Sequence, residues 1–180
     1  MNAKVLEKSW EERAREIGAG ATASIVAMVA ALDCDYDRLE ELREERAAYQ
    51  EEDSHKPLTK SWAQANPDDA EELAELEEAA GDCESLDDAE RRIQEDPLSL
   101  QFRSGWTSSG EPMQAEEFEL LLATGGPAVR IVGELDHNGE PYMALLEVQD
   151  WFEPWTQYLD IDGDTLLEYC RAAGVYYQGG

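Results

Sequence analysis

Cysteine and histidine are the residue types in this chain best suited to nucleophilic or metal chemistry, but their spacing favours neither. Cys34, Cys83 and Cys170 lie far apart and form no Cys-x-x-Cys pair, which indicates reduced thiols rather than a disulfide framework or a zinc site. His55 and His137 fall in expected loops, and neither has a cysteine or serine nearby in a nucleophile-like setting. We therefore expect no catalytic residue and no enzymatic activity.

Two further motifs resemble ligand-binding loops but depart from them in detail. Residues 160–164 read DIDGD. An EF-hand places glycine sixth and glutamate twelfth, whereas glycine is fourth here and no glutamate stands twelfth. Gly125-Gly126 precedes a strand-like segment rather than a helix start, which favours a tight turn over a phosphate-binding loop. The sequence thus predicts two turns, no metal site and no cofactor.

Negative charge is the dominant property of the sequence. The 180 residues include 42 acidic and 14 basic side chains, for a net charge of −28. Direct binding to nucleic acid or to an anionic membrane is excluded, because both depend on lysine and arginine. Solubility needs a net charge of only about 2–8 in magnitude, so the excess predicts a basic partner, such as a protein that binds nucleic acid. Adaptation to high salt is the alternative, and four lysines against ten arginines fit it.

The densest acidic segment, 68–96, has 14 acids among its 29 residues and only Arg91 and Arg92 as bases. As a helix it would be about 44 Å long with one carboxylate per roughly 3 Å, while a DNA strand has one phosphate per about 3.4 Å. A solvated helix face that keeps the protein soluble is the simpler interpretation. We expect the partner-binding acidic surface to comprise Asp68, Asp69, Glu71, Glu72, Glu75, Glu77, Glu78, Asp82, Glu84, Asp87, Asp88 and Glu90.

An aromatic cluster lies at residues 149–158. Packing of a strand end against the last helix is the favoured interpretation, and a hot spot for a protein partner is the alternative. The hot spot would comprise Trp151, Phe152, Trp155 and Tyr158. Arg130 is one of three bases after residue 97, so we expect it to form an internal ion pair.

The elements that would position these residues divide at Pro97 into an acidic helical region, 1–96, and a mainly β region, 97–180. The uncharged run 18–32 has 15 residues, too few to span a bilayer, which needs about 20, so we expect a buried helix there. A first helix is expected at 5–17, because Gly18 and Gly20 interrupt the helical pattern, and a second at 21–32. A third begins at Asp33 or Asp35 and ends before a loop at 51–62. Two more are expected from Pro67 to Gly81 and from Ser85 to Pro97.

The second region alternates apolar and polar residues in four segments. Strands are expected at 98–106, 118–123, 128–135 and 141–148, with Asn138-Gly139 as a hairpin turn. Thr165-x-x-Glu168 opens a last helix that ends at Gly174. The predicted fold is therefore α+β: an acidic helical N-terminal part followed by a small antiparallel sheet of three or four strands, covered by the C-terminal helix.

Several strings after residue 95 together resemble a group of small bacteriophage accessory proteins. They are DPLSL (96–100), RSGW (103–106), LATGGPAVRI (122–131), GEL (133–135), QDW (149–151) and PWT (154–156). The resemblance covers residues 96–180 and implies a phage or mobile-element origin, with expression in a bacterial cytoplasm. It implies no activity and assigns no site.

Three hypotheses about function follow. Very acidic, compact phage proteins often resemble nucleic-acid mimics that occupy the basic groove of restriction or CRISPR nucleases. The leading hypothesis is an inhibitor of such a host defence protein, which itself binds neither nucleic acid nor membrane. The second is a protein–protein scaffold that uses residues 151–158 and the alanine-rich helix 21–32. The third is a metal-dependent or hydrolytic enzyme whose site is assembled in space.

Overall fold

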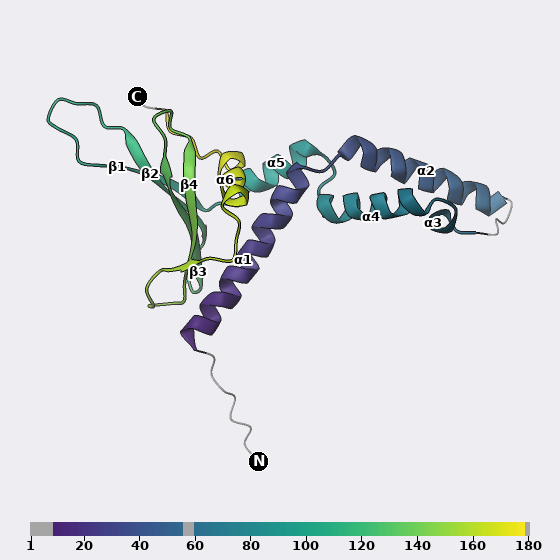
Figure 1. Cartoon of the computed structure of the whole chain (residues 1–180), viewed down its shortest axis with the longest axis horizontal. Coiled ribbons are helices and arrows are strands. Elements are labelled where there is room, and N and C mark those ends of the chain that lie inside the picture. Colours follow the sequence, from purple (N-terminus) through teal and green to yellow (C-terminus); the bar gives the residue numbers. More distant parts are fainter. Residues whose placement is uncertain (1–8, 56–59, 179–180) are drawn as a thin grey trace, which may run out of the picture. The chain divides into compact units, whose positions relative to one another are not determined.

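The computed structural model describes residues 9–55 and 60–178, which form six helices and a five-stranded antiparallel sheet, an α+β fold as expected (Figure 1). Residue contacts divide the chain into two compact units. We call residues 1–29 with 91–180 the sheet unit, and residues 30–90 the helical unit. This division differs from the expected regions 1–96 and 97–180. The first helix contributes apolar side chains to the sheet unit, although it precedes the acidic helices in sequence.

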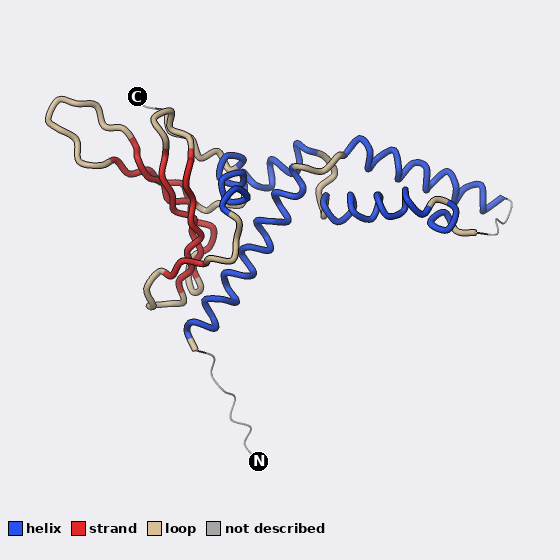
Figure 2. The backbone as a smooth tube through the Cα atoms, viewed as in Figure 1, coloured by secondary structure: helices blue, strands red, loops and turns tan. Residues whose placement is uncertain are grey.

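The sheet is an antiparallel meander in which each strand pairs with the next along the chain (Figure 2). The strands are β1 (Ser99–Ser104), β2 (Ala115–Ala123), β3 (Ala128–Leu135), β4 (Pro141–Gln149) and β5 (Thr156–Tyr158). The first four confirm the predicted segments. The fifth is an addition, because three residues are too few to show an alternating pattern.

The β3–β4 hairpin turns at Asn138-Gly139, as expected. Gly139 has a φ of +85°, and the Asp136 carboxylate accepts hydrogen bonds from the backbone N–H groups of Glu140 (2.9 Å) and Asn138 (2.8 Å). The hydrogen bond from Glu140, followed by those from Asn138, lowers the pKa of Asp136. The ionised Asp136 therefore stabilises the turn fully above the ordinary aspartate pKa. This stabilisation is lost as the pH falls through the lowered pKa of Asp136.

One face of the sheet is buried and forms the core of the sheet unit. Helix α6 (Gly163–Ala172) packs on β4, which confirms the expected cover by the C-terminal helix. Its cap is Asp162, whose carboxylate accepts from the backbone N–H of Thr165, so α6 begins before the predicted box at Thr165. The buried side chains of this core include Leu120, Ile131, Leu146, Val148, Leu166, Tyr169, Cys170 and Val175.

Helix α1 (Trp10–Leu32) is continuous, so the predicted break at Gly18 and Gly20 is wrong. Glycine costs a helix about 1 kcal/mol relative to alanine, and tertiary packing overrides that preference here. At Gly18 an added Cβ would lie 2.1 Å from a ring carbon of Tyr158, so the missing side chain lets α1 approach β5 closely. The glycine is a contact position rather than a helix terminator.

Among the described helices, α1 alone has the length and apolar composition that a membrane span requires. It is longer than the uncharged run 18–32, because charged residues such as Glu11 and Arg13 belong to its first turns. Ile25, Met28 and Val29 are buried within the sheet unit. The other residues of its apolar stretch include exposed ones, such as Val26, which is 47% exposed.

The helical unit is built around the pairing of α2 (Tyr36–His55) with α4 (Pro67–Ala80). Asp35 accepts from the backbone N–H of Arg38 and so caps α2, as expected. α2 continues to His55, so the predicted loop is wrong for residues 51–55, and its residues 56–59 lie outside the described part. Between the two helices, α3 (Trp62–Ala65) follows a capping box at Ser61.

The core of the helical unit is small and apolar. Its larger cluster of buried residues comprises Leu39, Leu42, Trp62, Leu73 and Ala80, and a second cluster comprises Ala31, Cys83 and Ala89. α4 begins after Asn66 and ends at Gly81, which has a φ of +55°, as expected. The last helix of this part, α5 (Leu86–Glu95), follows Ser85, whose hydroxyl accepts from the backbone N–H of Asp88.

Candidate functional site

The arginines of α2 are used inside the helical unit. Arg38 Nη2 lies 2.8 Å from Glu72 Oε2, and it also reaches Asp69 at 3.3 Å. Arg46 Nη2 lies 3.0 Å from Glu77 Oε1. The third arginine of α2, at position 43, reaches the same carboxylate at 3.5 Å. Arg38 also pairs with Glu41 of α2 itself at 2.8 Å, so the cations of α2 tie it to α4 and neutralise one carboxylate of its own surface.

These contacts also hold the paired groups in their charged forms. The hydrogen bond from Arg38 lowers the pKa of Glu72, and the hydrogen bonds from Glu72 and Glu41 raise the pKa of Arg38. Both side chains are half-buried and remain partly in contact with solvent, where ion pairs contribute little stability. Their main consequence is geometric, because they fix which faces of α2 and α4 meet.

The faces of α2 and α4 that point away from each other are acidic. On α4, Glu71, Glu75 and Glu78 are exposed and follow the three- and four-residue spacing of one helical face, opposite the buried Leu73. On α2, Asp37, Glu40 and Glu44 are exposed with the same spacing, opposite Leu39 and Leu42. We call these two sets the α4 stripe (Glu71, Glu75, Glu78) and the α2 stripe (Asp37, Glu40, Glu44).

The stripes have no cationic partner in the described part of the helical unit, since no ion pair with another described residue involves them. Together α2 and α4 contain 15 acids and 3 arginines, a net charge of −12. The 20 residues of α2 extend for about 30 Å, which gives one net charge per roughly 2.5 Å of axis. Duplex DNA has one charge per about 1.7 Å, so the two densities agree within a factor of about 1.5.

The two stripes lie on opposite edges of a rod, not side by side on one patch. Packed helices are about 8–10 Å apart and each is about 10–12 Å wide with side chains, so the pair is roughly 20 Å across. Charge on both edges suits a cleft that surrounds the rod better than a flat partner surface. The shape is therefore compatible with a groove built to hold a nucleic acid.

The predicted acidic surface divides into exposed and structurally engaged carboxylates. Asp69, Glu72 and Glu77 pair with arginines of α2, and Asp88 accepts from the backbone N–H of Glu84. The exposed members are Asp68, Glu71, Glu75, Glu78, Asp82, Glu84, Asp87 and Glu90. Sequence reasoning missed the α2 stripe. Its signal was present in the helical spacing of the α2 acids opposite the leucines of the same helix.

Salt is expected to stabilise this protein. Raising NaCl from about 0.02 to 0.3 M screens the self-repulsion of the −28 charge and should raise the midpoint of thermal unfolding by about 4 °C, measured by circular dichroism. KCl at equal ionic strength is the control and should give the same shift. A midpoint that stays constant or falls with salt would show that the paired arginines outweigh the repulsion.

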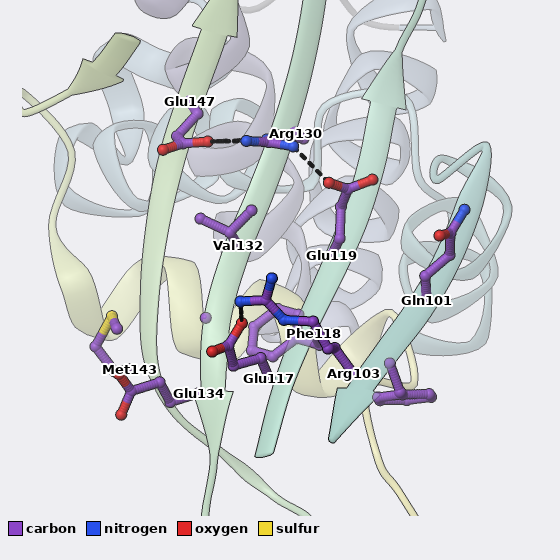
Figure 3. A pocket seen from close by; sticks show the side chains of 12 residues that line it. Gln101, Arg103, Glu117, Phe118, Glu119, Arg130, Val132, Glu134, Met143 and Glu147 are labelled. Atoms are coloured by element: carbon purple, nitrogen blue, oxygen red, sulfur yellow. Dashed lines mark hydrogen bonds and ion pairs between the residues drawn. The ribbon is translucent and has the colours of Figure 1, made fainter. Parts of the chain in front are cut away.

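The open face of the sheet has a shallow cavity of about 440 Å³ that contains the second charge cluster (Figure 3). Arg130 on β3 lies between Glu119 on β2 and Glu147 on β4, with N–O distances of 2.5 and 2.7 Å. Its guanidinium carbon is 4.1 Å from the ring centroid of Trp155. The predicted internal ion pair of Arg130 is confirmed. Because both carboxylates and the ring are engaged with it, this cluster braces three strands.

Replacing Arg130 by methionine should lower the free energy of unfolding by about 2 kcal/mol, because Glu119 and Glu147 lose their shared hydrogen-bond donor and repel each other. Urea unfolding monitored by fluorescence measures the change. Arg103→Met is the matched control, since Arg103 is 75% exposed and pairs with a single carboxylate, Glu117. Equal losses in the two variants would contradict the bracing role.

The cysteines and histidines show no arrangement for nucleophilic or metal chemistry in residues 9–55 and 60–178. The three cysteines are free thiols, and burial raises the pKa of Cys170 to about 12, which keeps it protonated at neutral pH. His137 lies in the β3–β4 turn, and the side chain of His55 lies outside the described part. No group of three or more metal-ligating side chains forms among the described residues.

The aromatic cluster is partly exposed. Trp151 and Phe152 are 63% and 99% exposed, so the predicted packing against the last helix is wrong for these two. Trp155 stacks on Arg130, and Tyr158 lies against α1 at Gly18. The loop between β4 and β5 thus presents the rings of Trp151 and Phe152 to solvent instead of burying them.

Comparisons of the chain with protein-family models, with curated proteins and with solved structures found no match. The α2–α4 pair combines two rows of exposed carboxylates with a regular helical geometry. Trp151 and Phe152 are both exposed in the β4–β5 loop.

Proposed function

We propose that this protein is an inhibitor that binds a basic, nucleic-acid-handling protein by mimicking the charge of nucleic acid. One observation supports it most directly. The arginines of the α2–α4 pair contact carboxylates within the pair. The carboxylates on both outer edges stay exposed, and the net charge per length of the pair is close to that of a duplex. A solubilising surface would not need so much charge.

The partner of such a rod has a cleft lined with lysine and arginine. Carboxylates at the outer edges approach those cations as phosphates would, and the long-range field speeds the encounter. The inhibitor then competes with the natural nucleic acid for the same cations, without any chemical step. Inhibition would therefore be reversible and weaker at high salt.

The class of partner that we propose is a host defence nuclease of the CRISPR or restriction type, in a bacterial cytoplasm. The resemblance of residues 96–180 to small phage accessory proteins supports this choice, because phage proteins that meet such nucleases gain from blocking them. The sheet unit supplies the remaining surface of the inhibitor.

A competition experiment tests the proposal. A purified restriction endonuclease and a guide-free CRISPR effector are each bound to a fluorescent duplex of about 20 base pairs, and the protein is added at rising salt. We expect displacement of the duplex at low salt and a steep loss of affinity between about 0.05 and 0.3 M NaCl. Displacement that does not depend on salt, or no displacement from any such nuclease, would refute mimicry.

A scaffold function is the second candidate, and the exposed Trp151 and Phe152 favour it. A scaffold that uses these rings would keep its partner at high salt, because burial of apolar surface is not screened. It would also tolerate neutral substitutions in the α2 and α4 stripes. The two functions thus make opposite predictions for the same measurement.

A further inference from the structure

The β4–β5 loop, residues 150–155, presents two aromatic rings to solvent in a strained backbone. The ring centroids of Trp151 and Phe152 are 6.4 Å apart, and both side chains are mostly exposed. Trp151 has a φ of +51°, the one non-glycine residue of the described part with a positive φ. That conformation costs a bulky residue about 1–3 kcal/mol, so the surrounding structure must hold it.

Two contacts hold the loop in this conformation. Asp150 is 7% exposed and pairs with Arg13 of α1, whose Nε lies 2.5 Å from its carboxylate. The ring of Trp151 lies over Gly126, where an added Cβ would come within 2.7 Å of it. The exposed rings are therefore tied to α1 through the buried Asp150 and to the β2–β3 turn through Gly126, and they are not a loosely attached loop tip.

An apolar groove of about 340 Å³ lies within the same unit, between α1 and the adjoining ends of β2 and β3. Its volume is at the lower end of the range for small-ligand pockets. Gly20 lies in its wall, and an added Cβ there would meet no atom within 4 Å. The lining residues from α1 are Glu16, Ile17, Gly20, Ala21, Ser24, Ile25 and Met28, and the others are Asp96, Leu122, Ala123, Pro127 and Val129.

The groove and the aromatic pair are continuous through the β2–β3 turn. Pro127 lines the groove, and the preceding residue, Gly126, lies beneath the ring of Trp151. The charged residues in the lining of the groove are Glu16 and Asp96, both acidic. The combined surface is thus apolar at its centre and acidic at its charged positions.

We propose that this surface binds an apolar segment flanked by lysine or arginine on the same basic partner, so the inference rests on the proposed function. The apolar side chains of that segment enter the groove beside Trp151 and Phe152, and its cations are attracted by the net negative charge of the chain. A second copy of this chain would bring another −28 charge, and an anionic lipid surface would be repelled. The groove contact only supplements the charge-driven contact of the helical unit, so binding of the whole partner still weakens as salt rises.

A synthetic peptide tests the docking surface on the full chain. The probe has two leucines, four residues apart, between flanking lysines, and it is titrated into isotope-labelled protein followed by NMR. We expect shifts at Gly20, Ala21 and the indole N–H of Trp151. A peptide with serine in place of both leucines, and one with glutamate in place of the lysines, should bind at least tenfold more weakly.

Two variants block the surface without threatening the fold. Gly20→Leu fills the groove and favours the helix, and Trp151→Gly removes the ring and relieves the positive φ. Each variant should bind the leucine peptide at least tenfold more weakly, and its midpoint of thermal unfolding should be equal to or higher than that of the unchanged protein. Trp106→Ala is the control, since this tryptophan is fully exposed on the β1–β2 loop and should not change affinity.

Several results would overturn the inference. Shifts confined to α2 and α4, or unchanged affinity in both variants, would show that charge alone attracts the peptide. Self-association in sedimentation that is lost in the variants would assign the surface to a second copy of the chain. Binding to zwitterionic lipid vesicles that is lost in the variants would assign it to a membrane. The two proposals fail in different measurements. If the mimicry proposal is wrong, the protein does not compete with the duplex, but it still binds the peptide. If the groove proposal is wrong, the protein still competes with the duplex.

Discussion

Replacing Glu71, Glu75 and Glu78 of the α4 stripe by glutamine should weaken binding to the basic partner nuclease at least tenfold at low salt. Each exposed contact contributes about 0.5–1 kcal/mol, so three of them contribute about 1.5–3 kcal/mol, which is a factor of ten or more. Extending the change to Glu40 and Glu44 of the α2 stripe should bring the loss to about a hundredfold. Duplex competition as a function of salt measures both, and the slope of affinity against salt should fall with each charge removed.

A matched variant separates position from total charge. Glu111, Glu116 and Glu140 are exposed in the sheet unit, and their replacement by glutamine removes the same charge as the change in the α4 stripe. If the rod is the mimic, this control should lose less than threefold in affinity. Equal losses in the two variants would mean that the whole negative field attracts the partner and that the α2–α4 geometry has no special part.

Substitution of Gly133 by valine should destabilise the sheet unit by about 3 kcal/mol or more. An added Cβ at this position would lie 2.1 Å from the backbone oxygen of Met143 and 2.5 Å from the ring of Phe118, so β3 and β4 would have to separate. For a chain of this length the thermal midpoint should fall by roughly 6–12 °C. Differential scanning calorimetry measures the change.

Gly163→Ala serves as the control for that prediction. Gly163 is the first residue of α6, and an added Cβ there would meet no atom within 4 Å. Its substitution should leave the midpoint within a degree or two or raise it, because alanine favours the helix. A Gly133 variant as stable as this control would mean that the strands relax around the new side chain.

Local pattern was enough to predict β2, β3 and β4, because one face of each of these strands is buried and shows as an alternation in sequence. β1 has no buried residue, and only the alternating residue types of its segment predicted it. The cap of α2 at Asp35, the start of α4 at Asn66-Pro67 and its end at Gly81 were likewise predictable from residue type, although the Asn66 side chain makes no capping hydrogen bond. Long-range contacts were not. Gly18 looks like a helix breaker until Tyr158, far along the chain, is seen to occupy the space of its side chain.

The candidate site was only partly predictable for the same reason. Acid density alone pointed to α4 and α5, but it could not show that Glu72 and Glu77 face α2 or that the outward acids of α2 complete the rod. That distinction depends on which helix packs against which. Arg130 was predictable as a paired cation because cations are scarce after residue 97, although its stacking on Trp155 was not.

The discontinuity of the sheet unit has a consequence for synthesis on the ribosome. The buried core of the helical unit comes from residues 31–89, so it is able to close before the first strand is translated. Gly18, in contrast, meets Tyr158 only after the intervening loop closes, at an entropic cost that grows slowly with its length. The nascent chain thus acquires its anionic rod first, while α1 remains exposed as an apolar helix that is open to chaperones until β5 emerges.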